Sequence, residues 1–506
     1  MKKFPVFTTL IFCLAGIINP FTIFGSGVAD TSPCVPCSSL KELHLPEVTI
    51  TSAGQVEKGK VHCRVTGVIG KEINFELLLP DSWNGRFVMG GGGGFVGSVQ
   101  NMAKWTLDQG YATSGTDTGH KGPGIKADWA FQNMERQLNF GYMGVHRTAV
   151  VSKAIIALYY CSSPEYSYFM GCSRGGGQAL MEAQRYPEDF DGIVAGAPAF
   201  SWPAMGAEII QNMQACYPNP NYLEEGIVTP ANLKLLQAAV LKQCDKLDGV
   251  KDGILNDPRD CAFNFSKLPT CPPDQPGDDC FTLTQLEAIK TIYKGVNSEG
   301  KMIYPGFPFG GEAEQGGWQE WITGPNEGTM TLNFPSAHFG FGTETFKYLI
   351  YNDPAWDYST FDFTTVTKEM DYASAYLDAT STDYSGFKAR GGKLILYHGW
   401  NDAALSALST INHYEAVKEG DENVMHYMRL YLLPGVLHCG GGPGPGEVDW
   451  LALVREWVEK DMAPERVVVS KTLGGQTTLS RPVFPYPRKA VYDGKGDTNK
   501  EASFHE

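Results

Sequence analysis

The stretch Tyr166-Ser-Tyr-Phe-Met-Gly-Cys-Ser-Arg-Gly-Gly176 decides the fold class of this chain. Its first five residues are mostly apolar and predict a strand, and residues 174–186 predict a helix that ends before a proline. Residues 171–175 fit the pattern G-x-S-x-G, in which a sharp strand-to-helix turn lifts a serine hydroxyl above a sheet. A glycine-rich helix start is the alternative, but the flanking strand and helix favour Ser173 as a nucleophile.

Strands and helices alternate on both sides of this stretch. Apolar runs predict strands at 61–79, 111–117, 166–170, 191–198, 393–398 and 429–433, with helices at 149–160, 174–186, 405–419 and 448–460. This alternation favours a mostly parallel, doubly wound sheet with helices on both faces. Between residues 201 and 390 the sequence shows no such alternation of strands and helices. We therefore predict an α/β fold with an α/β-hydrolase core over residues 30–200 and 391–506, and a large inserted lid domain over residues 201–390.

Two later turns supply the partners that a serine nucleophile needs. A base must remove the serine proton, and an acid must hold that base in one tautomer. In this fold the order along the chain is serine, acid, histidine, with the active site at the carboxyl ends of the strands. Asp402 follows the strand predicted at 393–398, and His438 follows the strand predicted at 429–433. We therefore predict Ser173, Asp402 and His438 as the catalytic residues.

Three other titratable residues compete for these roles. His398 is a rival base, but it ends the strand that supplies the acid, so we expect it to pack or hydrogen-bond locally. Asp117 and His120 follow another predicted strand and could compete as neighbours of the site. The spacing along the chain therefore favours His438 as the base.

Two cysteines lie next to the predicted catalytic residues. Cys172 directly precedes Ser173, and Cys439 directly follows His438. A disulfide between them would tie the two turns together, whereas the alternative is a pair of buried free thiols. Their adjacency to both predicted catalytic residues favours the bond.

These motifs resemble those of the tannase and feruloyl esterase family. The resemblance is carried by Gly171-Cys-Ser-Arg-Gly-Gly176, Tyr397-His-Gly-Trp-Asn-Asp402 and Pro434-Gly-Val-Leu-His-Cys439, and it extends from about Cys37 to Tyr492. It implies an α/β-hydrolase core, a large lid between nucleophile and acid, hydrolysis of esters of aromatic acids, and a Cys172–Cys439 bond. The family also includes hydrolases of aromatic half-esters such as mono(2-hydroxyethyl) terephthalate.

An acyl-transfer enzyme needs hydrogen-bond donors aimed at the developing oxyanion. The backbone N–H of Arg174, directly after the nucleophile, is one candidate. The second is expected from the glycine tract Gly90–Gly94, where the family resemblance implies Gly94. The tract could instead bind a nucleotide, but neither G-x-G-x-x-G nor G-K-[ST] follows in the required context.

The segment Asp245-Lys-Leu-Asp-Gly-Val-Lys-Asp-Gly-Ile254 carries three carboxylates at turn spacing, which suits a hard cation with several oxygen ligands. It is not an EF-hand, because Asn256 stands where that loop has its twelfth-position glutamate. A pair of Asp-Gly turns is the alternative. The segment also resembles the calcium loop of the family, which implies a structural Ca²⁺ in the lid, held by the carboxylates of Asp245, Asp248 and Asp252 and the carbonyls of Val250 and Ile254.

The chain has twelve cysteines, which predict disulfides in an exported protein. Removal of Cys13 with an export signal would leave eleven, so at least one thiol should stay free. Besides Cys172–Cys439, we expect the pairs Cys244–Cys261, Cys271–Cys280 and Cys37–Cys63, whereas Cys34, Cys161 and Cys216 have no obvious partners. Some relatives have another disulfide near the C-terminus, but this chain has only Phe484 there, so we expect packing alone to hold the tail.

Residues 1–29 have the pattern of an export signal, with two lysines, a nearly apolar run over 6–24 and small residues after it. An N-terminal membrane anchor is the alternative. No other segment has an apolar run near ~18 residues, so we expect a soluble mature protein without membrane contact, secreted or periplasmic, and monomeric or weakly oligomeric. The net charge of −15 and the scattered Lys and Arg residues argue against binding nucleic acid.

The predicted lid is rich in aromatic residues, with fifteen between Met302 and Phe363. Aromatic rings could sandwich a planar acyl group, although many must simply form the lid core. No arginine lies between Arg259 and Arg390, so the lid offers no guanidinium clamp for a substrate carboxylate. We place Trp318, Trp321, Phe334, Phe339, Phe341 and Phe346 near a pocket, with Trp321, Phe341 and Phe339 as substrate-binding candidates.

These observations predict a serine carboxylic-ester hydrolase that releases ferulate-like or gallate-like acids from small aromatic esters, such as those derived from plant polymers. Hydrolysis of terephthalate half-esters is the alternative within the same class. A serine peptidase or a non-catalytic binding protein on the same fold are the remaining interpretations, since a fold alone does not define a function.

Overall fold

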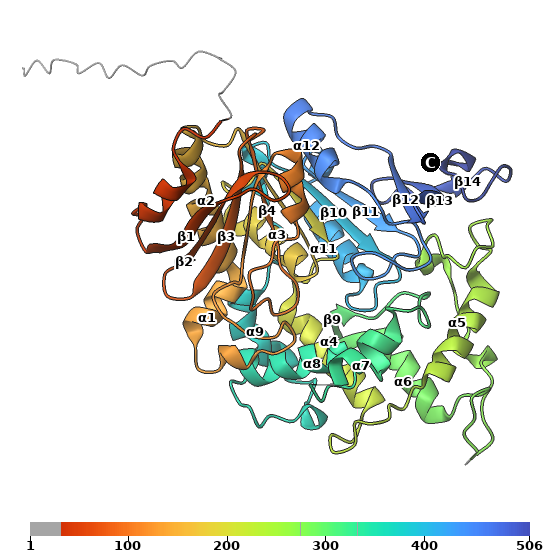
Figure 1. Ribbon diagram of the computed structural model, residues 1–506. Helices are drawn as coiled ribbons and strands as arrows, with labels where there is room; N and C mark the ends of the chain where they lie inside the picture. The colour runs from red at the N-terminus through yellow and green to blue at the C-terminus, as the bar shows by residue number, and fades with distance from the viewer. Residues whose placement is uncertain (1–31, 274, 331) are drawn as a thin grey trace, which may run out of the picture. The chain divides into compact units, whose positions relative to one another are not determined.

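The computed structural model describes residues 32–273, 275–330 and 332–506, and Thr31–Glu506 form one compact unit (Figure 1). The predicted export signal, residues 1–29, lies outside the described residues. Within the described part of the chain, no helix combines the length and the apolar composition that crossing a membrane requires.

A mostly parallel sheet forms the centre of this unit, as predicted. Nine strands follow the order β1-β2-β3-β5-β4-β6-β7-β10-β11. Pairs from β5 to β11 in this order are parallel, whereas β1–β2, β2–β3 and β3–β5 are antiparallel. The strands are β1 (Val48–Val56), β2 (His62–Ile69), β3 (Ile73–Pro80), β4 (Arg86–Gly90), β5 (Ala112–Thr116), β6 (Tyr166–Cys172), β7 (Gly192–Gly196), β10 (Lys393–Gly399) and β11 (Met428–Leu433).

Helices cover both faces of this sheet because successive strand residues point to opposite sides. On β6, Phe169 packs into a core with α2 (Gly144–Tyr160), α3 (Arg174–Arg185) and α11 (Ala407–Gly420). Its neighbour Tyr168 packs into a second core with α12 (Trp450–Lys460). The predicted doubly wound arrangement is therefore confirmed, and the helix and strand boundaries differ from the predicted ones by only a few residues.

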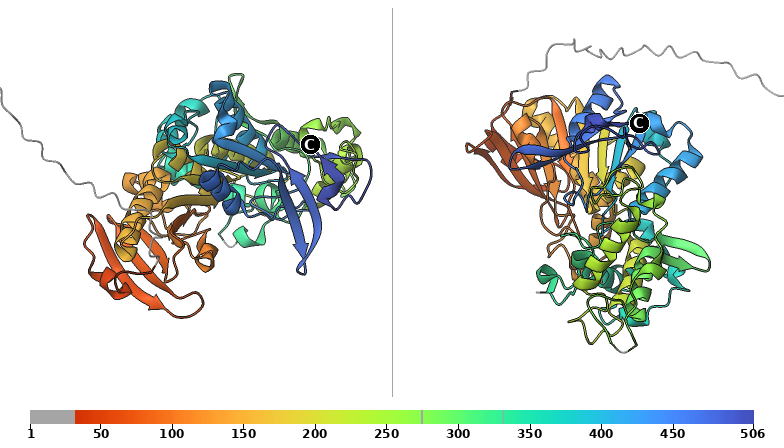
Figure 2. Two further views of the ribbon diagram at one scale, coloured as in Figure 1. Left: turned by 90° about the horizontal axis from the view of Figure 1, so that it is seen from above. Right: turned by 90° about the vertical axis from the view of Figure 1, so that its right-hand side faces the viewer.

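The long segment between β7 and β10, over its described residues, adds no strand to the main sheet. Its helices gather in the lower part of Figure 1, and the right-hand view of Figure 2 shows them together again. Most of these helices pack into one apolar core, which also includes Phe95, Trp129 and Phe140 from outside the segment, whereas Phe387 of α10 packs into the core with α2 and α3. The division into a catalytic and a lid domain at residues 201 and 390 stays a prediction. The segment contains α4 (Trp202–Cys216), α5 (Pro230–Cys244), α6 (Leu283–Lys294), α7 (Glu327–Met330), α8 (Ala337–Glu344), α9 (Val366–Leu377), α10 (Ser385–Ala389) and the hairpin β8 (Gly295–Ser298)–β9 (Lys301–Pro305).

Short elements complete the described chain. They comprise α1 (Met134–Leu138), the hairpin β12 (Val467–Leu473)–β13 (Gln476–Val483) and the pair β14 (Val491–Tyr492)–β15 (Phe504–His505). Turns of π-helix cover η4 (Asn139–Met143), η7 (Gln319–Thr323) and η8 (Thr345–Ile350). Turns of 3-10 helix cover η1 (Cys37–Glu42), η2 (Lys104–Gln109), η3 (Asp128–Ala130), η5 (Pro258–Asp260), η6 (Phe265–Lys267), η9 (Tyr358–Thr360), η10 (Val424–His426) and η11 (Glu501–Ser503).

Five disulfides cross-link the described chain. They are Cys34–Cys161, Cys37–Cys63, Cys172–Cys439, Cys244–Cys261 and Cys271–Cys280. The sequence suggested no partners for Cys34 and Cys161, because they are 127 residues apart and no local pattern indicates that Cys34 lies next to the end of α2. Cys216 is buried as a free thiol, and burial raises its pKa to about 12. A buried thiol that stays protonated is unreactive, so Cys216 acts as a packing residue.

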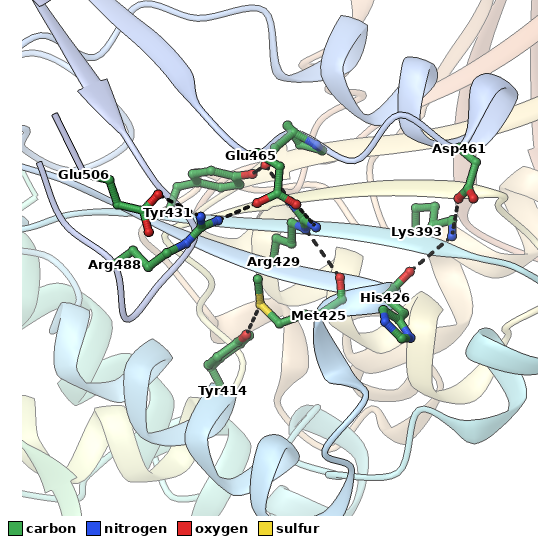
Figure 3. A network of polar contacts seen from close by, with 11 residues as sticks. Lys393, Tyr414, Met425, His426, Arg429, Tyr431, Asp461, Glu465, Arg488 and Glu506 are labelled. Atoms are coloured by element: carbon green, nitrogen blue, oxygen red, sulfur yellow. Dashed lines mark hydrogen bonds and ion pairs between the residues drawn. The ribbon is translucent and has the colours of Figure 1, made fainter.

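The expectation that packing alone holds the C-terminal tail is wrong. Glu465 bridges Arg429 and Arg488, with N–O distances of 2.6 Å to each, and Arg488 also contacts Glu506 at 3.1 Å (Figure 3). Glu465 is largely exposed, so each of these ion pairs contributes less than about 1 kcal/mol. Charged residues scattered in the sequence gave no sign of this network, because they meet only after the tail folds back on β11.

Candidate active site

Ser173 stands at the turn from β6 into α3 with a positive φ of 63°, a strained backbone for a residue that has a side chain. The flanking glycines make the turn possible. A Cβ atom on Gly171 would lie 2.6 Å from the carbonyl carbon of Gly175, and one on Gly176 would lie 2.3 Å from the carbonyl oxygen of Gly196. Backbone therefore packs directly on backbone here, and this close approach presents Ser173 at the carboxyl edge of the sheet.

Asp402 and His438 lie at the same edge, after β10 and β11. The Nδ1 atom of His438 is 2.7 Å from Oδ2 of Asp402, and Oδ1 of Asp402 accepts the N–H groups of Ala404 and Leu405. Burial raises the pKa of Asp402, but the charges and hydrogen bonds of the neighbouring histidines outweigh it and hold the pKa below its ordinary value. The carboxylate thus stays ionised and occupies Nδ1, which leaves Nε2 of His438 free for proton transfer.

His398 is fully buried and bonds locally, as expected, but it also contacts the acid. Its Nδ1 is 2.8 Å from the Thr410 hydroxyl, while Nε2 lies 3.1 Å from both the Leu405 carbonyl oxygen and Oδ2 of Asp402. Asp402 therefore holds two histidines. Of these two, only His438 reaches the surface of the edge, because His398 is 1% exposed.

Asp117 and His120 have partners of their own. Asp117 accepts hydrogen bonds from the backbone N–H groups of Asn74 and Gly119, and His120 bonds the Phe95 carbonyl through Nε2 while its ring stacks on Trp129. Burial lowers the pKa of His120 to about 4. Both residues support the β5 turn and do not line the cavity beside Ser173.

The Cys172–Cys439 disulfide joins the turn of the serine to the turn of the histidine, with Cα atoms 5.9 Å apart. Cys439 has a φ of 62°, so the chain bends sharply directly after His438. The ring of Trp321, from η7 in the insertion, packs edge-on against His438 at a centroid distance of 5.0 Å. His438 is therefore held by a carboxylate, a neighbouring disulfide and an indole ring.

The glycine tract after β4 supplies one backbone N–H without a protein acceptor. Gly91, Gly92, Gly93 and Phe95 each donate to an oxygen atom, whereas Gly94 donates to none within the described residues. Gly94 lines the same cavity as Ser173. This position requires glycine, because its φ is 55° and an added Cβ atom would lie 2.2 Å from the carbonyl oxygen of Gly124.

The second expected donor, the backbone N–H of Arg174, begins α3 and so has no acceptor within the helix. The Arg174 side chain points elsewhere: it donates to the carbonyls of Phe140 and Gly141 and stacks on the Phe140 ring. Burial lowers its pKa to about 10. Only the backbone of Arg174 can therefore face a substrate bound at Ser173.

A small cavity, open to solvent on one side, lies beside Ser173. Among the described residues of its walls there is no Asp, Glu, Lys or Arg, so it suits an uncharged, apolar group. Trp321 and Phe341 line it, with their rings parallel to within 14°. The lining residues are Gly94, Ser173, Ala199, Trp202, Met205, Ile209, Trp321, His338, Phe341, Ala404 and Leu405.

The other aromatic candidates lie elsewhere. Phe339 does not line the cavity: it packs against Tyr358 in the core of the insertion, because α8 turns Phe339 and Phe341 to different sides. Trp318 packs on Tyr293, and Phe346 packs on Trp356.

Helix α4 and His338 contribute to this cavity without having been predicted from the sequence. The helical pattern of α4 gives no sign of the face that meets the serine, and a lone histidine among phenylalanines carries no motif. Only the folding of the insertion over the sheet edge reveals these residues as neighbours of Ser173.

The predicted calcium loop has the donor chemistry for a hard cation. Val250, Ile254 and the carboxylates of Asp248 and Asp252 line one cavity. Burial, and then the neighbouring carboxylates, raise the pKa of Asp248, and burial has the same effect on Asp252. A bound cation would relieve this repulsion. Arg481 already offsets part of this negative charge, because its guanidinium lies 2.7 Å from the Asp252 carboxylate.

A different side-chain group could also hold a metal. Ligand atoms of His146 on α2, Glu182 on α3 and Asp189 all lie within 4.8 Å of one another. His146 Nδ1 contacts Asp189 at 2.6 Å, while the buried Glu182 carboxylate has no hydrogen-bond donor among the described residues. Burial and the adjacent Asp189 raise the pKa of Glu182 well above its ordinary value, so a proton satisfies this carboxyl group as well as a metal would.

The sheet order, the serine turn and the residues at the strand ends define the α/β-hydrolase class. A sequence profile of the tannase and feruloyl esterase family matches residues 59–506. The chain is 33% identical to mono(2-hydroxyethyl) terephthalate hydrolase of Piscinibacter sakaiensis, covering 88% of this chain and 84% of that protein. It is also 33% identical to a probable feruloyl esterase of Arthroderma benhamiae, covering 85% and 81%.

Solved structures agree with this similarity. Feruloyl esterase B from Aspergillus oryzae superposes with a TM-score of 0.82 at 26% identity, over 93% of this chain and 99% of that one. The chain therefore belongs to the tannase and feruloyl esterase family, and it is a carboxylic ester hydrolase.

Proposed function

We propose that this enzyme hydrolyses esters of phenolic acids through an acyl-enzyme on Ser173. The single observation that carries the proposal is the charge-free aromatic cavity that opens beside Ser173, at the edge where Asp402 holds His438. The names of several relatives, among them the feruloyl esterases, point to the same acyl groups.

The geometry supports the following steps. Nε2 of His438 takes the proton of Ser173 as Oγ attacks the ester carbonyl, and the ionised Asp402 stabilises the imidazolium that forms. The N–H groups of Gly94 and Arg174 stabilise the developing oxyanion, since each lacks an acceptor among the described residues. His438 then protonates the leaving alcohol, and afterwards it activates the water that releases the acid and regenerates Ser173.

The proposed acyl site lies against Trp321 and Phe341, whose ring centroids are 6.3 Å apart. Aromatic pairs contribute about 0.5–1.5 kcal/mol each, so stacking on one or two rings could favour aromatic over short aliphatic acyl groups by at least ~10-fold in kcat/KM. Terephthalate half-esters are the second candidate, favoured by the Piscinibacter sakaiensis relative. The described lining of the cavity carries no cationic side chain, so we expect the half-ester to be hydrolysed more slowly than its neutral diester.

The test is a panel of methyl esters assayed for kcat/KM with the wild-type enzyme, Ser173→Ala and Trp321→Ala. Hydroxycinnamates and hydroxybenzoates should exceed butyrate by ~10-fold or more, Trp321→Ala should reduce this preference, and a fluorophosphonate should label Ser173. An active Ser173→Ala variant would exclude the proposed nucleophile. Butyrate matching the aromatic esters would exclude acyl recognition by the cavity, and a faster half-ester would favour the second candidate.

We also propose that Asp245, Asp248 and Asp252, with the carbonyls of Val250 and Ile254, hold a structural Ca²⁺. The cavity that Asp248, Val250, Asp252 and Ile254 share and the raised pKa values of Asp248 and Asp252 support this proposal, whereas Asp245 is included on its place in the sequence alone. Export to an oxidising compartment, secreted or periplasmic, is proposed as well, because five disulfides persist only where thiols are not kept reduced.

A further inference from the structure

Among the described residues that line the cavity beside Ser173, His338 has the one ionisable side chain. It is 1% exposed and stands in the first turn of α8, where its ring lies edge-on to Trp321 at 6.1 Å. Its Nε2 atom is 2.9 Å from the carbonyl oxygen of Ala404. A carbonyl only accepts hydrogen bonds, so Nε2 carries the hydrogen.

The tautomer that this contact selects leaves Nδ1 as a hydrogen-bond acceptor. Burial lowers the pKa of His338 to about 4, so the ring is neutral at neutral pH and Nδ1 has a lone pair. Within the described residues Nδ1 has no partner, although it is buried. A buried acceptor without a donor is costly, so this atom demands a partner that the protein itself does not provide.

Because His338 lines the cavity beside Ser173, a hydrogen-bond donor on the bound acyl group would satisfy Nδ1. The other side-chain polar groups of the lining are Ser173, which the proposed mechanism uses, and two indole N–H groups, which cannot accept. A hydroxyl on an aromatic ring can donate to Nδ1, whereas an ionised carboxylate on the same ring only accepts and would face a lone pair.

We propose that His338 determines specificity: its Nδ1 atom accepts a hydrogen bond from a hydroxyl on the aromatic acyl ring of the substrate. This inference rests on the proposed function and names the feature that the enzyme recognises. It distinguishes phenolic acyl groups from unsubstituted, methoxylated or carboxylated rings of similar size. Sites built to bond a substrate hydroxyl discriminate strongly against the analogue without it, because the protein group is then left unpaired.

His338 also contacts the turn that carries Asp402, through Ala404, so two variants are needed to separate the two contacts. His338→Gln places an amide N–H near the position of Nε2, which keeps the bond to Ala404 and removes the Nδ1 acceptor. His338→Asn places its amide near the position of Nδ1, which keeps an acceptor there and loses the bond to Ala404.

The experiment compares kcat/KM for methyl 4-hydroxycinnamate, its 3-hydroxy isomer, methyl 4-methoxycinnamate and methyl cinnamate. For the wild type we expect the better hydroxylated ester to exceed both esters without a hydroxyl by at least ~10-fold. In His338→Gln this ratio should fall at least ~10-fold, whereas in His338→Asn the ratio should be largely retained while kcat falls for all four esters.

Equal rates for hydroxylated and unsubstituted esters in the wild type would overturn the inference but leave the proposed function intact. So would an unchanged ratio in His338→Gln, which would make His338 only a positioning residue for the Asp402 turn. If none of the four aromatic esters is hydrolysed, the proposed function itself fails. Circular dichroism of both variants establishes that each is folded before the ratios are compared.

Discussion

Single residues in this molecule are tuned by burial and by few, specific partners. Asp402 is the clearest case, because its carboxylate meets two histidines and two backbone N–H groups at once. Glu208 is the opposite case: it is buried in α4, and its only partner among the described residues is the amide of Asn212 at 2.5 Å. The free-energy cost of desolvating the carboxylate is outweighed at Asp402 and only partly offset, by the Asn212 amide, at Glu208.

Asp402→Asn should lower kcat by about 10⁴-fold, because an amide does not hold His438 in the tautomer that accepts the serine proton. Steady-state kinetics on an aromatic ester measure the loss, and KM should change little. Asp117→Asn is the matched control, since Asp117 is an equally buried carboxyl outside the cavity, and it should reduce stability rather than kcat. A loss of less than tenfold in Asp402→Asn would rule out Asp402 as the orienting acid.

Glu208→Gln should make the enzyme more stable relative to wild type at alkaline pH than at acidic pH. Burial raises the pKa of Glu208 from 4.5 to about 8. The folded protein therefore keeps a proton that the unfolded chain releases, and the wild-type free energy of unfolding falls as pH rises from about 4.5 to 8, by at most about 1.4 kcal/mol per pH unit. Glutamine carries no such proton and lacks this dependence.

Thermal unfolding of wild type and Glu208→Gln at pH 5 and pH 9 measures this effect. The exposed Glu287 provides the control, because Glu287→Gln should shift the melting temperature equally at both pH values. If the difference in melting temperature between wild type and Glu208→Gln is the same at pH 5 and pH 9, the raised pKa of Glu208 does not explain the pH dependence of stability.

The strands and turns act together at the carboxyl edge of the sheet. The turn after β6 presents Ser173, the turn after β10 presents Asp402, and the turn after β11 presents His438. The Cys172–Cys439 disulfide spans the first and the third of these turns. One covalent bond therefore helps to fix the geometry between elements that are 267 residues apart in sequence.

Removal of this bond in the double variant Cys172→Ala/Cys439→Ala should lower kcat by up to ~10²-fold, because a displacement near 1 Å between serine and base has that effect. The melting temperature should fall too, since the bond closes a long loop. Cys271→Ala/Cys280→Ala is the control: it opens a loop of nine residues in the insertion and should leave kcat near the wild-type value. Non-reducing peptide mapping verifies each pairing, and two free thiols in active wild-type enzyme would contradict the prediction.

The molecule as a whole joins the sheet and the insertion around one cavity. Gly94 and Ser173 come from the sheet edge, while α4, η7 and α8 of the insertion close the other walls. A second junction lies at the proposed calcium loop, where Asp252 contacts Arg481 of β13 and the Asn256 amide donates to the Ala490 carbonyl. If this cavity binds the acyl group as proposed, substrate recognition depends on how the insertion is anchored as well as on the catalytic turns.

Chelation of calcium should lower the melting temperature more than it lowers kcat at room temperature, because the proposed ligands stabilise this junction and do not line the cavity. At free calcium about 100 times Kd, binding stabilises the folded state by about 2.7 kcal/mol. Metal analysis, calorimetry with chelator and re-addition of calcium measure this, with Asp248→Ala expected to abolish the response. The exposed Asp260 gives the control variant, Asp260→Ala. A metal-free protein whose stability Asp248→Ala does not change would remove the site.

The sequence by itself determined the class of fold and the positions of its main strands and helices. Ser173 and its glycines form a local pattern, and apolar periodicity marks strands and helices through interactions between near neighbours. The motifs identified the family, and the aromatic composition of the insertion suggested Trp321 and Phe341 near a pocket. Both residues line the cavity, and their role in substrate binding stays a prediction. Composition could not indicate that Phe341 lines the cavity and Phe339 does not, because both are phenylalanines of the same aromatic-rich segment.

Only the tertiary structure decided which distant residues meet. It paired Cys34 with Cys161, brought Glu465 between two arginines, placed Phe339 in the core and set His338 against the cavity. The physical reason is that these contacts join segments tens to hundreds of residues apart, where no periodicity records the approach. Their geometry arises when the insertion buries its apolar core and closes over the edge of the sheet.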